Sequence, residues 1–380
     1  MFFKKKSATE QVISIAALGF LGGILLSWPL WNEAARFWFP LLPVWGGATK
    51  PPLWGSFIHC AKPIGLITLL LLTFFFSGKK WLLAALTVWA IGLCCLDINR
   101  LQPWVWLYIL VFVAVFFGKK ENEISTANAL RWLLAGVYFW SGFNKLTPYF
   151  AEDNFAWFCG AFAFTKPFGE YPVLGYAVAS LEMSFAAGLI WEKTRLYFRW
   201  VVVGFHGVVI LFLLKLDWNW VVIPWNVAMA GMVWGLFPEN SGSKPTGVVQ
   251  QVIVVVVWLA PVLYFFNLWP HTLSWQLYSN TQPEATFFAE KNTGYANTES
   301  EQVWGKYAFD DGTKILLDDW ATDELKVPMF ATARTFRQVG KYLCPHFVSD
   351  SAGLYILSVH RWDKSAEKME KIPCRELLAK

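Results

Sequence analysis

The feature that most limits how this chain can fold is a series of nine apolar segments, each close to the length of a membrane-spanning helix. They cover approximately residues 12–30, 56–77, 81–97, 104–118, 128–147, 172–191, 197–215, 219–237 and 248–267. A helix of about 20 apolar residues spans the hydrocarbon core of a bilayer and satisfies its own backbone hydrogen bonds there. Residues 1–267 therefore predict an all-α polytopic membrane bundle.

The composition agrees with a chain that contacts a lipid bilayer. Of its 380 residues, 56% are hydrophobic and 18% are aromatic, which exceeds the usage typical of soluble domains. The net charge of +5 is spread through short loops rather than gathered in a basic patch. This pattern favours a role in membrane orientation and argues against a nucleic-acid partner.

The basic residues also predict an orientation. With nine spans, the loops rich in lysine and arginine fall on one side of the membrane, and that side is expected to be cytoplasmic. The residues in question are Lys4, Lys5, Lys6, Lys79, Lys80, Lys119, Lys120, Lys193, Arg195, Arg199 and Lys244. The N-terminus is then a cytoplasmic, uncleaved signal anchor, and the chain from residue 268 onward lies outside the cytoplasm.

From about Thr281 the charges become more frequent and the apolar runs shorter. Val303–Leu317 has two short runs around Asp-Asp-Gly, which indicates a β-hairpin. Thr332–Phe347 has the pattern of a helix, and Gly353–Trp362 that of a strand. We therefore expect residues 268–380 to form a small extracytoplasmic α+β domain.

Lys145 is the first candidate for chemistry, because it lies near the end of the apolar helix predicted for Arg131–Phe150. Burial disfavours the charged ammonium and can leave a neutral amine that acts as a base. Alternatively, a lysine near a helix end lays its stem along the interface while its amine reaches water. The sequence leaves both interpretations open.

Two further ionisable residues lie within predicted spans. Glu182 is in span six and His206 is in the middle of span seven. Intramembrane ionisable residues usually mark functional sites, and these two can pair with each other or with Asn226 in span eight. Alternatively, each only makes a polar contact between helices, worth about 1 kcal/mol.

Polar residues also gather in the predicted turn between spans three and four, which contains Asp97, Arg100 and Gln102. Arg100 can clamp a carboxylate or phosphate of a ligand, because its planar fork suits such acceptors. It can equally pair with Asp97 and order the turn. Trp104, just after the turn, is either an interfacial aromatic residue or part of a ligand pocket.

The segment Tyr149–Tyr171 is rich in Phe and Trp. Aromatic rings are enriched at membrane interfaces, so the segment is expected to lie partly in one. It either covers the ends of spans five and six as a lid, or only anchors the chain.

The six cysteines contain no Cys-x-x-Cys motif and no metal-like cluster with histidine, so no zinc site is expected. All six map to the predicted outer side, where disulfides persist. Cys344 and Cys374 are a candidate structural pair, although spacing alone does not fix connectivity. The adjacent Cys94 and Cys95 are either a redox pair or small buried residues.

Six motifs of this chain occur together in a distinctive order. They are YFWSGFNKL (138–146), LDINRLQPWVWLY (96–108), LEMSFAAGL (181–189), GFHG (204–207), KYAFDDGTKIL (306–316) and TARTFRQVGKYLCPHF (332–347). In this order they resemble the vitamin K-dependent gamma-carboxylase superfamily, including its bacterial horizontally transferred transmembrane domain (HTTM) relatives. The resemblance runs from about residue 56 to residue 365, and the chain resembles the DoxX and MauE membrane proteins more weakly.

The resemblance implies roles for three residues. Lys145 would be the base that deprotonates a reduced quinone, Glu182 stands where the family has an acidic residue, and His206 resembles the family's later histidine. A further histidine of the family would fall near Trp104, where this chain has none, and Gln102 is the nearest polar residue.

The resemblance also implies a location, a cofactor and a partner. These are a bacterial inner membrane, a menaquinone- or vitamin K-like hydroquinone, and an extracytoplasmic protein or peptide. The function classes are then a carboxylase-like or quinone-linked enzyme, a non-catalytic scaffold or partner-binding subunit, and a thiol or quinone redox protein of the DoxX/MauE type.

Overall fold

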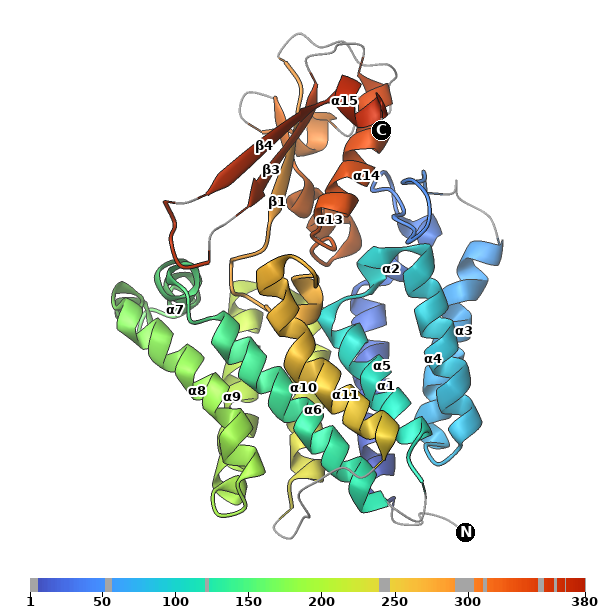
Figure 1. Ribbon diagram of the computed structural model, residues 1–380, viewed down its shortest axis with the longest axis vertical. Helices are drawn as coiled ribbons and strands as arrows, with labels where there is room; N and C mark the ends of the chain where they lie inside the picture. The colour runs from blue at the N-terminus through green and yellow to red at the C-terminus, as the bar shows by residue number, and fades with distance from the viewer. Residues whose placement is uncertain are drawn as a thin grey trace. The chain divides into compact units, whose positions relative to one another are not determined.

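The computed structural model is mostly helical, with one small antiparallel sheet near the C-terminus (Figure 1). The prediction of helices followed by a mixed α and β segment is confirmed at that level. The structure describes residues 6–51, 57–119, 123–238, 247–290, 304–309, 313–347, 352–358, 361–365 and 367–379.

Four helical segments among the described residues are long and apolar enough to cross a membrane, which is compatible with a membrane protein. They are Ala8–Leu26, Pro172–Ile190, Arg195–Leu216 and Val248–Phe266. Each of the nine predicted spans contains a helix, but the others are shorter or less apolar. Nine spans therefore remain a prediction.

The chain divides into two compact units, and helices α3 (Phe57–Phe75) and α4 (Lys80–Leu96) contribute to both. Unit 1 comprises Met1–Leu26, Gly65–Ile91 and Gln102–Asn280; unit 2 comprises Ser27–Ile64, Gly92–Leu101 and Thr281–Lys380. The predicted domain boundary between residues 267 and 268 stays a prediction.

Unit 1 is built from apolar helices that pack in pairs (Figure 1). Helix α6 packs on α8 and α11, α9 on α8 and α10, and α1 on α10 and α5. Their bounds are α1 Ala8–Leu26, α5 Pro103–Phe116, α6 Glu123–Asn144, α8 Pro172–Ile190, α9 Arg195–Leu216, α10 Ile223–Leu236 and α11 Val248–Leu259.

Proline sets several helix boundaries in unit 1. Pro103 and Pro172 begin α5 and α8, where a missing N–H costs nothing because the first helical N–H groups have no partner. Pro148 has the opposite effect on α6, because proline disfavours a helical conformation at the residue before it. Helix α6 ends at Asn144, so the predicted continuation to Phe150 is wrong and Lys145 lies directly after the helix.

Gly142 allows α6 and α8 to approach closely. A Cβ atom at this position would lie 2.2 Å from the backbone N of Met183 and 2.7 Å from the carbonyl O of Ala179. These are backbone atoms of α8, so they cannot move aside as a flexible side chain would. The contact therefore requires glycine, and it brings the end of α6 next to the middle of α8.

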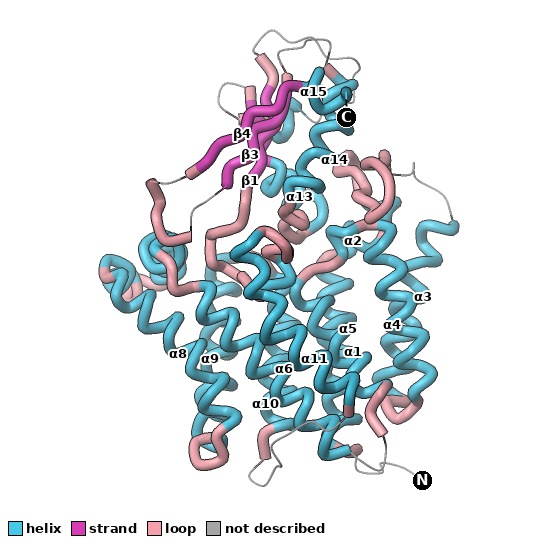
Figure 2. The backbone as a smooth tube through the Cα atoms, in the orientation of Figure 1, coloured by secondary structure: helices cyan, strands magenta, loops and turns pink. Residues whose placement is uncertain are grey.

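The sheet, whose strands are magenta in Figure 2, belongs to unit 2. Its order is β2-β1-β3-β4, and every neighbouring pair is antiparallel. Phe287 in β1 pairs with both Ile315 in β2 and Leu354 in β3, and all three side chains are fully buried. The strands are β1 Glu284–Phe288, β2 Lys314–Leu316, β3 Gly353–Ser358 and β4 Lys368–Pro373.

Helices α13 (Leu317–Leu325) and α14 (Ala333–Leu343) contact the sheet, and α15 (Cys374–Ala379) contacts β3, β4 and α14. Helix α14 and the following 3-10 turn Cys344–His346 confirm the predicted helix, and Thr332 caps it. Strand β3 confirms the predicted strand over its first six residues.

The predicted hairpin over Val303–Leu317 is wrong in its first half. Residues 304–307 are helical, and β2 pairs with β1 instead. Only an isolated bridge joins Phe309 to Lys314, and the Asp-Asp-Gly turn lies outside the described residues.

Candidate functional site

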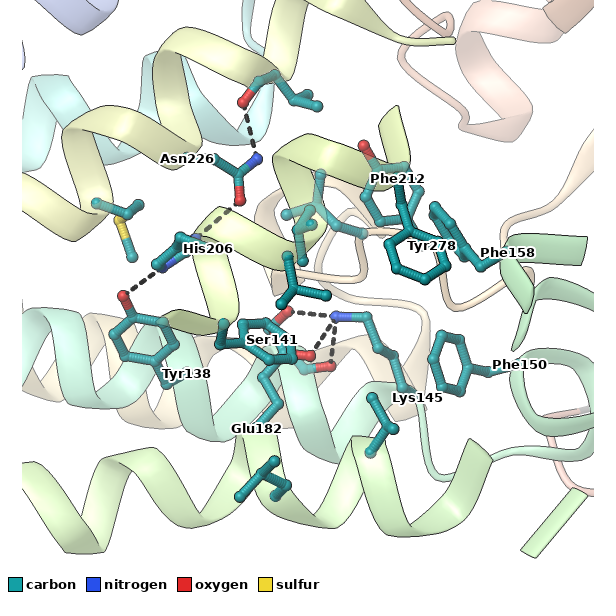
Figure 3. A pocket seen from close by; sticks show the side chains of 18 of the residues that line it. Tyr138, Ser141, Lys145, Phe150, Phe158, Glu182, His206, Phe212, Asn226 and Tyr278 are labelled. Carbon is teal, nitrogen blue, oxygen red and sulfur yellow. Dashed lines mark hydrogen bonds and ion pairs between the residues drawn. The ribbon is translucent and has the colours of Figure 1, made fainter. Parts of the chain in front are cut away.

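Unit 1 contains a cavity of about 450 Å³ between α6, α8, α9 and α10. Most of its lining is aliphatic or aromatic, which suits the apolar body of a small organic ligand. The polar exceptions come from all four helices and form two hydrogen-bonded groups (Figure 3). They are Tyr138, Ser141, Lys145, Glu182, His206 and Asn226.

The first polar group is an ion pair between Lys145 and Glu182. The Lys145 Nζ atom lies 2.8 Å from Glu182 Oε2 and 2.8 Å from Ser141 Oγ, and 3.4 Å from the Ser141 carbonyl O. Lys145 is 6% exposed, whereas an amine that reached water would be exposed. The geometry thus fits the buried interpretation of Lys145 rather than the interfacial one.

Glu182 uses only one of its two carboxylate oxygens in this pair. Oε2 accepts the hydrogen bond from Lys145, and Oε1 has no hydrogen-bond partner among the described residues. Glu182 is buried at the wall of the cavity. A carboxylate oxygen can accept two hydrogen bonds, so Glu182 can still accept one from a ligand.

The second polar group is a chain from Tyr138 through His206 to Asn226. The Tyr138 OH lies 2.8 Å from His206 Nε2, and His206 Nδ1 lies 2.8 Å from Asn226 Oδ1. Asn226 Nδ2 donates in turn to the carbonyl O of Val222 at 2.8 Å. Tyr138, His206 and Asn226 are all buried, so the chain holds each ring and amide in one orientation.

Aromatic residues close another part of the cavity wall. Phe150, Phe158 and Tyr278 line it, and the rings of Phe158 and Tyr278 lie 5.7 Å apart. Asn154 Nδ2 donates to the Tyr278 carbonyl O at 2.6 Å and fixes the loop. Burial raises the pKa of the Tyr278 hydroxyl. Part of the aromatic segment Tyr149–Tyr171, expected to be either a lid or an anchor, thus lies at the cavity.

The candidate residues in and just after the turn between predicted spans three and four do not line this cavity. Gln102 and Trp104, in unit 1, are not among the residues that line the cavity. Trp104 is 2% exposed and packs against Phe20, with ring centroids 5.7 Å apart. The indole therefore fills the helix core, so Trp104 is not exposed at an interface and does not line this cavity.

Asp97 and Arg100 belong to unit 2 and are fully buried there. Asp97 forms an ion pair with Arg36, and Arg100 pairs with Glu33 at 3.1 Å. The alternative in which Arg100 pairs with Asp97 is therefore wrong, because its partner is Glu33. Arg100 also donates to two carbonyl oxygens, at 3.0 Å each, so its fork is occupied by the protein itself and cannot clamp a ligand.

Cys344 and Cys374 form a disulfide between the end of α14 and the start of α15. The other four cysteines are free, including the adjacent Cys94 and Cys95. Cys159 lines the cavity, and burial raises the pKa of its thiol, which disfavours the reactive thiolate. Within the described residues, no three His, Cys, Asp or Glu side chains are grouped to hold a metal ion.

Sequence reasoning missed Tyr138 and Ser141 as site residues. Both lie in the YFWSGFNKL run, at seven and four positions before Lys145. Residues three, four and seven apart share one face of a helix, so this spacing was the signal that could have identified them.

No protein-family model, curated protein or solved structure is significantly similar to this chain.

Proposed function

We propose that this chain is a membrane enzyme that binds a hydroquinone-type ligand in the cavity of unit 1 and removes a proton from its hydroxyl. In this proposal Lys145 and Glu182 act together as the base. The observation that carries it is that Lys145, Glu182 and His206, which lie far apart in the sequence, line one buried and mostly apolar cavity.

The cavity favours a ligand with an apolar ring and polar substituents. Its volume of about 450 Å³ lies within the range of sites for small organic molecules. Aromatic side chains such as Phe158 and Tyr278 provide surfaces for a ring. The few polar atoms would orient the ligand, because each must be hydrogen-bonded when the cavity is filled.

The proton transfer that we propose conserves charge inside the site. The ligand O–H bond breaks, its proton forms a new O–H bond with Glu182, and the electron pair remains on the ligand oxygen. The Lys145 ammonium, 2.8 Å from the carboxylate before transfer, then stabilises the phenolate. The negative charge thus moves from the Glu182 carboxylate to the ligand oxygen and stays beside the Lys145 ammonium. No charge is left isolated in the apolar cavity, where its cost would be high.

The motif resemblance supports a role for Lys145 in the same proton transfer. The lysine of the YFWSGFNKL motif is the base that acts on reduced vitamin K in the gamma-carboxylase superfamily, and here Lys145 occupies that position. We therefore also propose membership of this superfamily, a menaquinone- or vitamin K-like hydroquinone as cofactor, and an extracytoplasmic protein or peptide as partner. A bacterial inner membrane with a cytoplasmic N-terminus is part of the same proposal.

The experiment measures oxygen uptake by the purified protein in lipid nanodiscs with trimethylhydroquinone, since the phenolate is the form that reacts readily with oxygen. General-base catalysis contributes about a hundred- to ten-thousandfold in rate, so Lys145→Met and Glu182→Gln should each slow uptake by an amount in that range. Rates equal to wild type in both variants would remove the pair from the reaction.

The matched control is Lys62→Met. Lys62 also forms a lysine–glutamate ion pair, with Glu33 at 3.0 Å, but it belongs to unit 2 and does not line the cavity. Oxygen uptake by Lys62→Met should stay at the wild-type rate.

The same assay distinguishes the two rival functions. If the protein functions only as a scaffold, no variant changes oxygen uptake. If it is a thiol redox protein, uptake responds to cysteine alkylation and not to Lys145→Met.

A further inference from the structure

We infer that Tyr138 is a second ligand-binding residue of this cavity, and that its phenol oxygen accepts a hydrogen bond from a second hydroxyl of the ligand. This inference rests on the proposed function and adds a specificity determinant to it. It follows from the direction of the hydrogen bonds that run from Tyr138 to Asn226 (Figure 3).

The direction is fixed at the Asn226 end of the chain. Asn226 Nδ2 donates to the Val222 carbonyl O at 2.8 Å, so the amide oxygen is the atom that faces His206. An amide oxygen only accepts hydrogen bonds. His206 Nδ1 must therefore carry the proton and donate it.

The tautomer of His206 then determines what Tyr138 does. In a neutral imidazole with the proton on Nδ1, Nε2 is an acceptor. The Tyr138 OH, 2.8 Å from Nε2, donates its single hydrogen to that nitrogen. All three hydrogen bonds thus point the same way, from Tyr138 toward Val222.

The series of hydrogen bonds begins at the Tyr138 oxygen, and this oxygen can still act as an acceptor. Once its hydrogen is used by His206, the Tyr138 oxygen keeps only lone pairs, and Tyr138 lines the cavity. Glu182 Oε1, on the same lining, also has lone pairs and no partner among the described residues. The cavity therefore offers two acceptors, which match a ligand with two hydroxyl donors.

This arrangement distinguishes between related ligands. Replacing one ligand hydroxyl by a methoxy group removes a donor and sets an ether oxygen against the Tyr138 lone pairs. A ligand carbonyl at that position also has no hydrogen to donate to the Tyr138 oxygen. The oxidised form of the ligand should therefore bind more weakly too. His206 and Asn226 act through Tyr138 in this scheme and are positioning residues.

The experiment compares two probes, trimethylhydroquinone and its monomethyl ether, by isothermal titration calorimetry under argon with the full-length protein in detergent. One net hydrogen bond between neutral groups corresponds to about three- to tenfold in affinity. We expect wild type to prefer the hydroquinone by about that factor. Tyr138→Phe should lose this preference by weakening hydroquinone binding while leaving ether binding unchanged.

The matched control is Tyr108→Phe. Tyr108 is also fully buried in unit 1, but it does not line the cavity and its hydroxyl has no partner among the described residues. This variant should keep the wild-type preference. A second variant, Asn226→Leu, removes the acceptor for His206 Nδ1–H and should reduce the preference without changing the Tyr138 ring.

The outcomes separate this inference from the proposed function. If Tyr138→Phe retains the full wild-type preference, Tyr138 does not receive the second hydroxyl and the inference is wrong. If wild type binds neither probe, the proposed function fails as well. If wild type binds the hydroquinone and Lys145→Met weakens that binding, while Tyr138→Phe has no effect on selectivity, only the inference fails.

Discussion

Both compact units bury ion pairs, but the pairs differ in how completely they are satisfied. In unit 2, Asp97 accepts from Arg36 and also from the backbone N–H groups of Leu42 and Asn99 at 3.3 and 3.1 Å. In unit 1, Glu182 accepts only from Lys145 among the described residues, and both line a cavity. A saturated pair can only support structure, whereas an incompletely satisfied pair can bind something else.

Arg36 shows how strongly unit 2 depends on its network. Its guanidinium donates to Asp97 and to the carbonyl oxygens of Pro29 and Leu30, at 2.8 and 2.7 Å for the carbonyls. Burial lowers the pKa of Arg36, while the Asp97 charge opposes that effect. Without Asp97, the buried Arg36 guanidinium would have no negative charge as close to it.

The largest effect is therefore expected for Asp97→Ala. Breaking a buried ion pair by removing one partner costs about 3–5 kcal/mol. Glu182→Gln keeps an acceptor for Lys145 but removes its negative charge. Its cost should therefore lie above the roughly 1 kcal/mol of a polar contact between membrane helices and below the roughly 3 kcal/mol of a fully broken buried pair. Thermal unfolding of both variants in detergent measures the difference, and equal costs would break the distinction between the two pairs.

The disulfide provides the next largest effect, and it is confined to unit 2. Cys344 and Cys374 are 30 residues apart in sequence, and a disulfide that closes a loop of this length contributes about 3–4 kcal/mol by restricting the unfolded chain. Cys374→Ala should increase hydrogen exchange in β3 and β4 by mass spectrometry. Exchange around Lys145 should remain at the wild-type level, and a matching increase there would show that the units do not unfold separately.

Asp318 in unit 2 is expected to make the stability of the fold depend on pH, by an amount no larger than the contribution of the disulfide. Burial raises its pKa from 3.8 to about 6. A carboxyl group whose pKa is raised on folding stabilises the fold below its unfolded pKa, and this contribution is lost as the pH rises through the folded value. One pKa unit corresponds to about 1.4 kcal/mol, so about 3 kcal/mol is lost between acid and neutral pH.

The measurement for Asp318 is the unfolding temperature of unit 2 across this pH range. Asp318→Asn keeps an oxygen acceptor for the Met329 N–H, which lies 2.9 Å from Asp318 Oδ1, but it cannot titrate. Its melting temperature should vary less with pH than that of wild type. Identical pH profiles would assign the dependence to other groups.

A smaller effect on stability than those in unit 2 is expected from Gly142→Ala in unit 1. A Cβ would meet the α8 backbone, and overpacking of this kind costs about 1–3 kcal/mol. Since the helices must separate, Lys145 and Glu182 should move apart and hydroquinone binding should weaken. Gly204→Ala is the control, because a Cβ there meets no atom within 4 Å. Normal binding by Gly142→Ala would mean that the pair does not depend on this contact.

Local patterns in the sequence were sufficient for the helical segments and for part of unit 2. Apolar runs of helical length predicted the helices, and the pattern of Thr332–Phe347 predicted α14, which Thr332 caps. The helix end at Asn144 was missed, although Pro148 provides the physical reason. The partner of Arg100 was missed because Glu33 is 67 residues away, and spacing carries no information about such contacts.

The site was predictable only in part for the same reason. Lys145, Glu182 and His206 stood out because ionisable residues are costly in apolar helices. Their convergence depends on how α6, α8 and α9 pack, which Gly142 helps to determine through backbone contacts. Tyr138 had no such prominence, since a tyrosine in an aromatic helix is ordinary until its hydroxyl is placed 2.8 Å from His206.

Glu324 on α13 accepts hydrogen bonds from three consecutive backbone N–H groups, those of Phe37, Trp38 and Phe39, at 3.3, 3.0 and 2.8 Å. The two segments are more than 280 residues apart. During synthesis, residues 37–39 must therefore wait until almost the whole chain has been made before they reach their final conformation. Contacts of such long sequence separation slow folding, so the completion of unit 2 is expected to be a late step in the biogenesis of this protein.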